Sequence, residues 1–274
     1  MSKFNNKYLK VGIVGIGTVG LPVARWLDNG EEGLQLAAIS TGNKGRALQI
    51  LNTFKTKTPI VEIEELANLC DVIVECALPQ KFFDIADPVV RAGKTLILLS
   101  ATSLLKHMSL IDLARKSGGR IIIPTGAILG LDAVRAASLG TVNSITMITR
   151  KPPKGLEKAP FIMEEGLNLK GLTKEKLLYE GPVTDAAEKF PANVNVAVAL
   201  SLAGIGPDKT KYQVWADPNV VRNTHVIKVE ANTASFEMKI SNIPTEENPA
   251  TGEIVCLSVI ESLRGLVTHF KVGT

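Results

Sequence analysis

The sequence is poor in cysteine and contains no long hydrophobic run. Only three cysteines occur among 274 residues, and Cys70, Cys76 and Cys256 all lie in apolar surroundings. An odd number of cysteines in such surroundings fits buried thiols in a reducing compartment better than a disulfide framework. No apolar run approaches the roughly 18 residues of a membrane span, and the polar N-terminal segment SKFNNKY has no signal-peptide core. We therefore expect a cytoplasmic protein without a membrane partner.

The chain also lacks a large excess of charge of either sign. Its 31 lysine and arginine residues against 27 acidic residues give a net charge of +4, and they form no basic stripe. This balance disfavours a nucleic-acid partner, whereas a mild positive excess suits an anionic substrate or cofactor. The hydrophobic fraction of 45% is ample for buried cores, and the length is sufficient for two domains.

Glycine, by contrast, recurs at an informative spacing in the stretch Lys10–Gly20, which reads KVGIVGIGTVG. An apolar run directly precedes Gly15, Gly17 and Gly20. In this spacing the first glycine permits a tight turn, the second lets the backbone approach a pyrophosphate, and the third lets the next helix pack on the strand. The N-terminus of that helix then offers free N–H groups and the positive end of a dipole.

The segments around this glycine turn supply the context that the motif requires. A helix-like segment follows at Leu21–Leu27, and a second strand is predicted at Leu34–Ser40. This context indicates a dinucleotide-binding turn, as opposed to a structural glycine turn in another α/β protein. We expect NAD or NADP to contact Gly15, Gly17, Thr18, Val19, Gly20, Ser40, Thr41, Lys44 and Ala77.

The turn after the second predicted strand has no acidic residue. Many NAD enzymes place a carboxylate there to hold the adenine ribose hydroxyls. We therefore predict that NADP is accepted and preferred, the alternative being a solvated loop that tolerates either cofactor. The residues that offer donors or positive charge to a 2′-phosphate are Ser40, Thr41, Asn43, Lys44 and Arg46.

Strand-like and helix-like segments alternate through the rest of the first 126 residues. Strands are predicted at Asp71–Ala77, Thr95–Ala101 and Arg120–Gly126, with a shorter one at the start of Thr58–Leu69. This alternation predicts an N-terminal doubly wound parallel sheet of the Rossmann type. Glu75 falls at the carboxyl end of its strand, where ligands of such α/β sheets bind.

The pattern changes after Ala127. Val142–Ile148 and three later segments alternate apolar and polar residues, as half-exposed antiparallel strands do. Residues 172–191 read as helical and rich in turns, and residues 192–206 as a long apolar helix. We expect a second, α+β domain with a largely antiparallel sheet, which is also a candidate homodimer surface. The predicted domains are 1–126 for dinucleotide binding, with the C-terminal helix of 246–274 packing back on it, and 127–245 for substrate binding, catalysis and oligomerisation.

Histidine is scarce, with three residues in the chain. A base that works near neutral pH is most often sought among histidines. His107 lies between an apolar strand and a helix, and His269 lies near the C-terminus, so we interpret both as surface or packing residues. His225 begins a strand of the second domain in RNTHVIKVE. From the residues alone, a catalytic and a structural role for His225 are equally supported, and no metal site is predicted.

Five longer segments carry a resemblance that covers nearly the whole chain. They are PTGAILGLDAVRAAS, TRKPP, FPANVNVAVALSLAGIGPDKT, ADPNVVRNTHVIKVE and SNIPTEENPATG. Together with the glycine turn, in this order and spacing, they resemble the L-aspartate dehydrogenase family. The resemblance implies oxidation of L-aspartate with NAD or NADP to iminosuccinate, which hydrolyses to oxaloacetate and ammonia or supplies quinolinate synthesis. It also implies His225 as the catalytic residue and Ala127 and Asn193 as cofactor contacts.

The chemistry of such a reaction requires the functional groups that His225 and Asn193 carry. Hydride leaves the α-carbon of an amino acid only when the amine is neutral, so a base must accept a proton from the ammonium group. A neutral His225 can do this, and it can also activate a water molecule at the imine carbon. Asn193 can orient the nicotinamide amide or ribose, and it also suits the N-cap of the helix that follows.

A dicarboxylate amino acid also needs cations or paired N–H donors to bind it. Arg150, Lys151 and Arg222 lie in the matching segments and are candidates, although a solvated salt bridge is an equally good explanation for each. Thr125 and the backbone at Gly126 can contribute as well.

The chain departs from the family pattern in three places. The acidic residue after the second strand is missing, Thr125 stands where serine is usual, and residues 230–240 lack a glycine-rich form. An altered amino-acid pocket is therefore a second hypothesis, in which the chain is homoserine-dehydrogenase-like or another small-acid oxidoreductase on the same fold. A third is a non-catalytic NADP-binding sensor.

Overall fold

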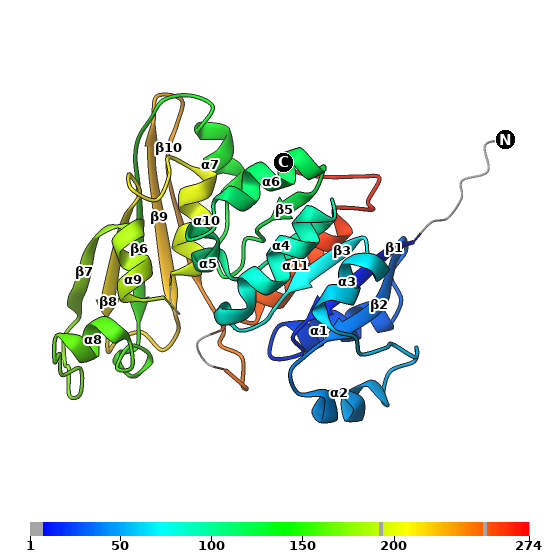
Figure 1. Ribbon diagram of the computed structural model, residues 1–274. Helices are drawn as coiled ribbons and strands as arrows, with labels where there is room; N and C mark the ends of the chain where they lie inside the picture. Colours follow the sequence, from blue (N-terminus) through cyan, green and yellow to red (C-terminus); the bar gives the residue numbers. More distant parts are fainter. Residues whose placement is uncertain (1–7, 192–193, 249–250, 274) are drawn as a thin grey trace. The chain divides into compact units, whose positions relative to one another are not determined.

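The computed structural model describes residues 8–191, 194–248 and 251–273 (Figure 1). The chain divides into two compact units. The first takes in the chain up to Pro124 and also Cys256–Val272, and the second takes in Thr125–Val255. Each unit contains a five-stranded sheet. In the described ranges, no helix has both the length and the apolar character needed to cross a membrane.

The sheet of the first unit is parallel throughout, with the strand order β2-β1-β3-β4-β5. Its strands are short apolar runs because helices cover both faces of such a sheet; all four residues of β3, for example, are buried. The predicted parallel sheet of the Rossmann type is thus confirmed. The strands are β1 (Leu9–Val14), β2 (Leu34–Ser40), β3 (Val72–Glu75), β4 (Thr95–Leu98) and β5 (Arg120–Ile122).

A sixth position in this sheet is reduced to a single residue pair. Ile60 forms a parallel bridge with Ile39 of β2, and the N–H of Val61 donates to the Ile39 carbonyl at 2.9 Å. The short strand predicted near residue 60 is therefore one bridge long. Beyond it the chain crosses to β3, on the other side of β1, so the strand order reverses between β1 and β3. Ligands of open α/β sheets bind at the carboxyl ends of strands beside such a reversal.

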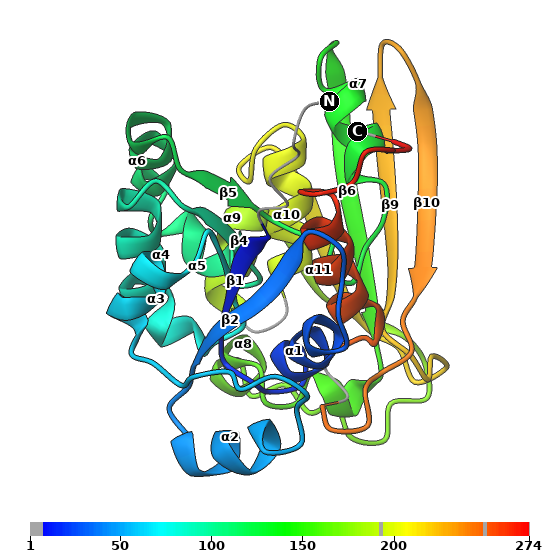
Figure 2. The ribbon, with the colours of Figure 1, turned by 90° about the vertical axis from the view of Figure 1, so that its right-hand side faces the viewer.

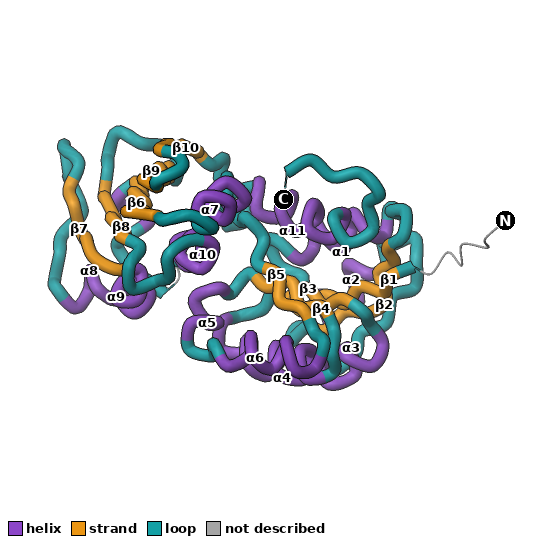
Figure 3. The backbone as a smooth tube through the Cα atoms, turned by 90° about the horizontal axis from the view of Figure 1, so that it is seen from above, coloured by secondary structure: helices purple, strands orange, loops and turns teal. Residues whose placement is uncertain are grey.

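Helices cover both faces of the first sheet. Figures 2 and 3 show α11 beside α1 on one face, with α3, α4 and α6 on the other. Val259 and Leu263 of α11 are fully buried in the same apolar cluster as Val11 and Leu27, so the C-terminal helix completes this core. The helices are α1 (Gly20–Asp28), α2 (Lys44–Leu51), α3 (Ile63–Leu69), α4 (Phe82–Arg91), α5 (Ala101–Leu105), α6 (Ser109–Ser117) and α11 (Ile254–Arg264), with a 3-10 turn η1 (Pro79–Lys81).

The sheet of the second unit has the order β10-β9-β6-β8-β7 and is antiparallel except where β6 pairs with β8. Figure 2 shows β6, β9 and β10 as long neighbouring strands. The prediction of a largely antiparallel second sheet is confirmed. The strands are β6 (Val142–Lys151), β7 (Lys176–Pro182), β8 (Lys211–Ala216), β9 (Thr224–Ala231) and β10 (Ser235–Ser241).

Strand β7 corrects the prediction that residues 172–191 are helical and rich in turns. Its pairing with β8 shifts register between Leu177 and Tyr179. Because of this bulge the consecutive residues Leu178 and Tyr179 are both buried, and the alternation that signals a strand is lost. The helical part of the prediction is correct only for the segment that follows β7, which forms α9.

Helices lie on one side of the second sheet, where Figure 3 shows α7, α9 and α10. Buried side chains on β6 alternate with partly exposed ones, and Met147, Thr149 and Lys151 are buried. We call the face that carries these three the covered face, and the face that carries Ile148 and Arg150 the open face. The helices of the second unit are α7 (Leu131–Ala137), α8 (Pro160–Glu164), α9 (Val183–Lys189) and α10 (Asn195–Ala203), with a 3-10 turn η2 (Pro153–Gly155).

Candidate cofactor and catalytic sites

The glycine turn after β1 has the tight geometry that its spacing predicts. Gly15 has a positive φ of 89°, and its N–H donates to the Ser40 carbonyl at 2.8 Å, which joins the ends of β1 and β2. A Cβ at Gly15 would lie 2.5 Å from the Cys76 carbonyl oxygen, and one at Gly20 would lie 1.9 Å from the Gly15 carbonyl oxygen. The fold itself therefore requires glycine at both positions.

Gly17 has a different explanation. No heavy atom of the described residues lies within 4 Å of a Cβ built there, so packing does not require glycine. Beside it, α1 begins at Gly20 after Thr18 and Val19, and within the described chain no side chain caps this helix. A bare backbone at Gly17 and an uncapped helix N-terminus are what a pyrophosphate needs in order to approach N–H groups. The residues present thus fit a dinucleotide.

A carboxylate from a later part of the chain pairs with a lysine at the start of α2, directly after the turn that follows β2. Lys44 forms an ion pair with Glu62, which lies 18 residues further along the chain. Asn43 is committed to capping α2, because its side chain accepts a hydrogen bond from the Arg46 N–H at 3.0 Å. Both partners of the Lys44–Glu62 pair are more than half exposed, so the pair can open. Lys44 is thus not an isolated positive charge. Glu62 provides, in part, the carboxylate that the sequence of the turn lacks.

Glu75, at the end of β3, is fully buried and organises the neighbouring loops. Its carboxylate accepts hydrogen bonds from the N–H groups of Ala77, Leu99 and Ser100 at 3.0–3.2 Å, and from the Ser100 hydroxyl at 3.0 Å. Burial raises the pKa of the Glu75 carboxyl, and these hydrogen bonds oppose the rise. Glu75 therefore fixes the backbone of Ala77, an expected cofactor contact, at the edge where the strand order reverses.

The second unit contains a buried polar cluster centred on His225. His225 is 3% exposed on β9, and its Nδ1 lies 2.9 Å from Oγ1 of Thr149, which is directly opposite it on β6. The Tyr212 hydroxyl of β8 hydrogen-bonds to Thr149. Lys151, two residues beyond Thr149 on the same face, is 6% exposed. Three adjacent strands thus place a histidine, a lysine, a threonine and a tyrosine together on the covered face.

Burial dominates the electrostatics of this cluster. It lowers the pKa of His225 to about 3, and the positive charge of Lys151 contributes to the same shift. Burial also lowers the pKa of Lys151 to about 8 and raises the pKa of Tyr212 to about 12. At neutral pH the imidazole is therefore neutral and the tyrosine protonated. With Nδ1 bonded to Thr149, Nε2 is the nitrogen available to a substrate.

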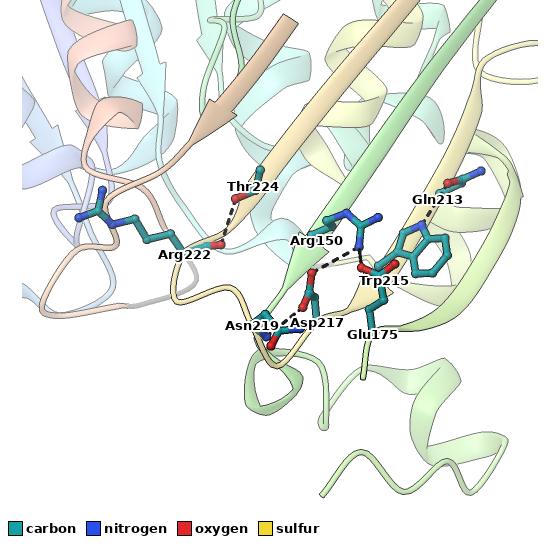
Figure 4. A network of polar contacts seen from close by, with 8 residues as sticks. All are labelled: Arg150, Glu175, Gln213, Trp215, Asp217, Asn219, Arg222 and Thr224. Atoms are coloured by element: carbon teal, nitrogen blue, oxygen red, sulfur yellow. Dashed lines mark hydrogen bonds and ion pairs between the residues drawn. The ribbon is translucent and has the colours of Figure 1, made fainter. Parts of the chain in front are cut away.

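The three candidate cations lie in different places. Arg150 projects from the open face, forms ion pairs with Glu175 and with Asp217 at 3.3 Å, and lies 4.9 Å above the Trp215 ring (Figure 4). Arg222 is exposed, and Figure 4 shows its guanidinium directed away from Arg150. Only Lys151 of the three lies on the same face as His225.

Ala127, an expected cofactor contact, is held by a residue that the sequence does not single out. Its carbonyl accepts a hydrogen bond from Nδ2 of Asn242 at 2.9 Å. Asn242 is 4% exposed, and its Oδ1 is buried without a partner among the described residues. Its position directly after β10, in the matching segment SNIP, is the one local signal that could have identified it. Asn193, the other expected contact, lies outside the described residues.

The remaining histidines lie away from this cluster. His107 packs against the rings of Phe82 and Phe83, with centroids 6.0 and 4.6 Å away. His269 is exposed. Both placements agree with the packing and surface roles expected from the sequence, and they leave His225 as the histidine with a polar environment suited to chemistry.

Comparison with known proteins agrees with this arrangement. Residues 15–124 match the family described as homoserine dehydrogenase, NAD binding domain, and residues 132–266 match aspartate dehydrogenase, C-terminal. L-aspartate dehydrogenase of Bradyrhizobium diazoefficiens is 47% identical over 97% of this chain and 94% of its own length, and L-aspartate dehydrogenase 3 of Bordetella bronchiseptica is 46% identical over 97% and 98%. The crystal structure of aspartate dehydrogenase from Thermotoga maritima shares the fold, with a TM-score of 0.73 and 23% identity over 97% of this chain and all of that one. The chain belongs to the L-aspartate dehydrogenase family.

Proposed function

We propose that this protein oxidises L-aspartate with NAD(P) to iminosuccinate, which hydrolyses to oxaloacetate and ammonia. The observation that carries the proposal is the buried, neutral His225, oriented by Thr149 on a chain that also carries a dinucleotide-binding turn. Membership of the family, with curated relatives up to 47% identical, supports the choice of substrate.

The residues of the chain have separate roles in this reaction. His225 accepts a proton from the substrate ammonium at Nε2, while Thr149 and the strand pairing hold the ring in place. The nicotinamide, when bound, accepts the hydride. After hydride transfer, the same imidazole can assist the addition of water at the imine carbon. The glycine turn, Ala77 and Ala127 are the proposed cofactor contacts.

Both cofactors are proposed to work, with NADP preferred. Ser40 and Thr41 offer hydroxyl groups, and Lys44 and Arg46 offer positive charge, in the turn that contacts the adenine ribose. Glu62 opposes the preference by pairing with Lys44. Steady-state kinetics with both cofactors test this, and a large preference for NAD would contradict it.

The test of the activity is a spectrophotometric screen of NAD(P)H formation across L-amino acids, beginning with L-aspartate. His225→Ala should lower kcat/KM by about 100-fold or more, the usual contribution of general acid–base catalysis. His269→Ala, a change at an exposed histidine, is the matched control and should behave as wild type. Aspartate oxidation by His225→Ala at the wild-type rate and with the wild-type pH profile would disprove the assigned role.

One observation favours a second candidate. The match of residues 15–124 to the homoserine dehydrogenase NAD-binding domain leaves open a hydroxy-acid or other amino-acid substrate, because this domain does not select it. Turnover of homoserine in the same screen, without turnover of L-aspartate, would establish that alternative.

We further propose a cytoplasmic homodimer. All three cysteines lie in the described chain and none of them forms a disulfide, which suits a reducing compartment. On the open face of the second sheet, Ile148, Trp215 and Val226 are only partly buried, which supports an association through this sheet. Sedimentation analysis tests the dimer, and a monomer at working concentrations would refute it.

A further inference from the structure

We propose that Lys151 is a substrate-binding residue, whose ammonium group binds a carboxylate of the amino-acid substrate beside His225. The proposal rests on the proposed dehydrogenase function and deepens it. Of the three candidate cations, only Lys151 lies on the same face of the second sheet as His225, the candidate base.

The register of the sheet fixes this placement. Thr149 of β6 is paired with His225 of β9, and the next residue, Arg150, is paired with Thr224. Because side chains alternate along a strand, Lys151 returns to the face of Thr149 and His225, whereas Arg150 lies on the other face. The acid directly after β8, Asp217, forms an ion pair with Arg150 at 3.3 Å.

Burial makes the charged form of the Lys151 amine costly. Its side chain is 6% exposed, and burial disfavours the charged amine. Even so, a pKa of about 8 leaves the amine mostly protonated at neutral pH. A substrate carboxylate would offset part of this cost, and a charge-assisted hydrogen bond to it would be stronger than one between neutral groups.

The same contact would also make His225 a stronger base. The charge of Lys151 disfavours protonation of His225 while no substrate is bound. A carboxylate on Lys151 would neutralise that effect, so that the imidazole becomes a better base only when substrate is present. Helix α10 has no titratable residue. On the other covering helices, Asp132, Arg135, Asp185 and Glu188 are exposed, and Lys189 lies over the Tyr179 ring.

The test compares Lys151→Met and Lys151→Arg in the full-length enzyme, with Lys228→Met as matched control. Lys228 is an exposed lysine of β9 that pairs with Glu237. Loss of a buried charge contact should lower kcat/KM for L-aspartate by about 30-fold or more in Lys151→Met, mainly through KM. Lys151→Arg should recover part of this loss. The KM for the cofactor should stay near the wild-type value in all three variants.

The pH profile tests whether the charge of Lys151 acts on His225. Removing the positive charge beside His225 should move the acid limb of kcat/KM to higher pH in Lys151→Met, because this limb reports the free enzyme. The acid limb should be unmoved in Lys151→Arg and in Lys228→Met. If Lys151→Met does not fold, the same comparison is made with Lys151→Gln, and cofactor binding shows that the variant is native.

Two competitive inhibitors distinguish which carboxylate is bound. L-asparagine keeps the α-carboxylate of aspartate, and 3-aminopropanoate keeps its other carboxylate. Weaker inhibition of the folded variant by only one of them assigns that carboxylate to Lys151. Unchanged inhibition by both, with wild-type kcat/KM and an unmoved acid limb, would overturn the proposal. A wild-type enzyme that does not oxidise aspartate would refute the proposed function instead.

Discussion

The ion pair between Lys44 and Glu62 sets the charge of the turn after β2. Glu62→Gln should shift the ratio of kcat/KM values towards NADP, because it frees Lys44 and removes a carboxylate that can accept from ribose hydroxyls. The shift should be severalfold and no more, since an exposed ion pair is worth about 1 kcal/mol or less. Steady-state kinetics with both cofactors measure it. Glu64→Gln, an exposed neighbour on α3, is the control, and an equal shift there would contradict the explanation.

The contact between Asn242 and the Ala127 carbonyl makes a second prediction for a single residue. Asn242→Ala would leave that carbonyl without its donor, and the loop that carries Ala127 would lose its anchor. We expect a higher KM for the cofactor and a smaller change in the KM for the amino acid. Asn143→Ala, at an exposed position of β6, should leave both values unchanged. Cofactor affinity of Asn242→Ala equal to that of wild type would show that Ala127 needs no such support.

These residues show why sequence patterns locate the sites only in part. The spacing of Gly15, Gly17 and Gly20 reports a local turn, and the turn has the predicted form. The partners that decide charge and orientation are distant in sequence: Thr149 is 76 residues from His225, and Asn242 is 115 from Ala127. No local pattern reports such pairs. The choice of Lys151 over Arg150 likewise needs the strand register.

At the level of elements, Glu75 joins the ends of β3 and β4 to the start of α5 through three backbone N–H groups. Glu75→Ala would leave the N–H groups of Ala77 and Ser100 without the acceptor that they have in the wild type, whereas the Leu99 N–H keeps the Glu75 backbone carbonyl at 3.3 Å. Each unsatisfied group costs about 1–3 kcal/mol, so the free energy of unfolding should fall by at least about 2 kcal/mol. Urea unfolding measures this fall. Glu64→Ala, on the exposed side of α3, should change little.

The pH dependence of this effect has a definite sign. Burial raises the pKa of Glu75 in the folded chain, so the folded state holds the proton more tightly than the unfolded state does. The contribution of Glu75 is therefore complete below the pKa of the unfolded chain, and it is lost as pH rises through the folded value. The difference between wild type and Glu75→Ala should be larger in acidic than in alkaline buffer. A difference that grows with pH would contradict this account.

The elements themselves followed from the sequence wherever one periodicity persisted. The buried runs of β1 and β2 and the alternation of β6 and β9 are confirmed as strands. Strand β7 was missed because its bulge buries two consecutive residues. The strand predicted near Ile60 shrinks to one bridge, since a sheet edge can be completed by a single pair of hydrogen bonds. Local irregularity, which tertiary packing decides, thus marks the limit of the periodic signal.

At the level of the whole molecule, the C-terminal helix α11 packs in the core of the first unit. Leu263 of α11 is fully buried among residues of β1, β2 and α1, whereas Leu257 on the same helix is 58% exposed. Leu263→Ala should lower the free energy of unfolding by about 2–5 kcal/mol, the usual cost of a cavity in a packed core. Leu257→Ala should have little effect. Thermal unfolding of the two variants measures the difference, and equal midpoints would exclude α11 from this core.

Cofactor binding should offset this loss, because the glycine turn belongs to the same unit. A ligand that binds only the folded state adds about 2.7 kcal/mol at a concentration 100 times its Kd. Saturating NADP should therefore raise the midpoint of Leu263→Ala towards that of the free wild type. Gly17→Asp places a carboxylate where the pyrophosphate approaches, so saturating NADP should no longer raise the midpoint of this variant. The variant itself should lose little stability, because the space around Gly17 is open in the described chain. Protection of Gly17→Asp equal to that of wild type would mean that the dinucleotide does not lie on this turn.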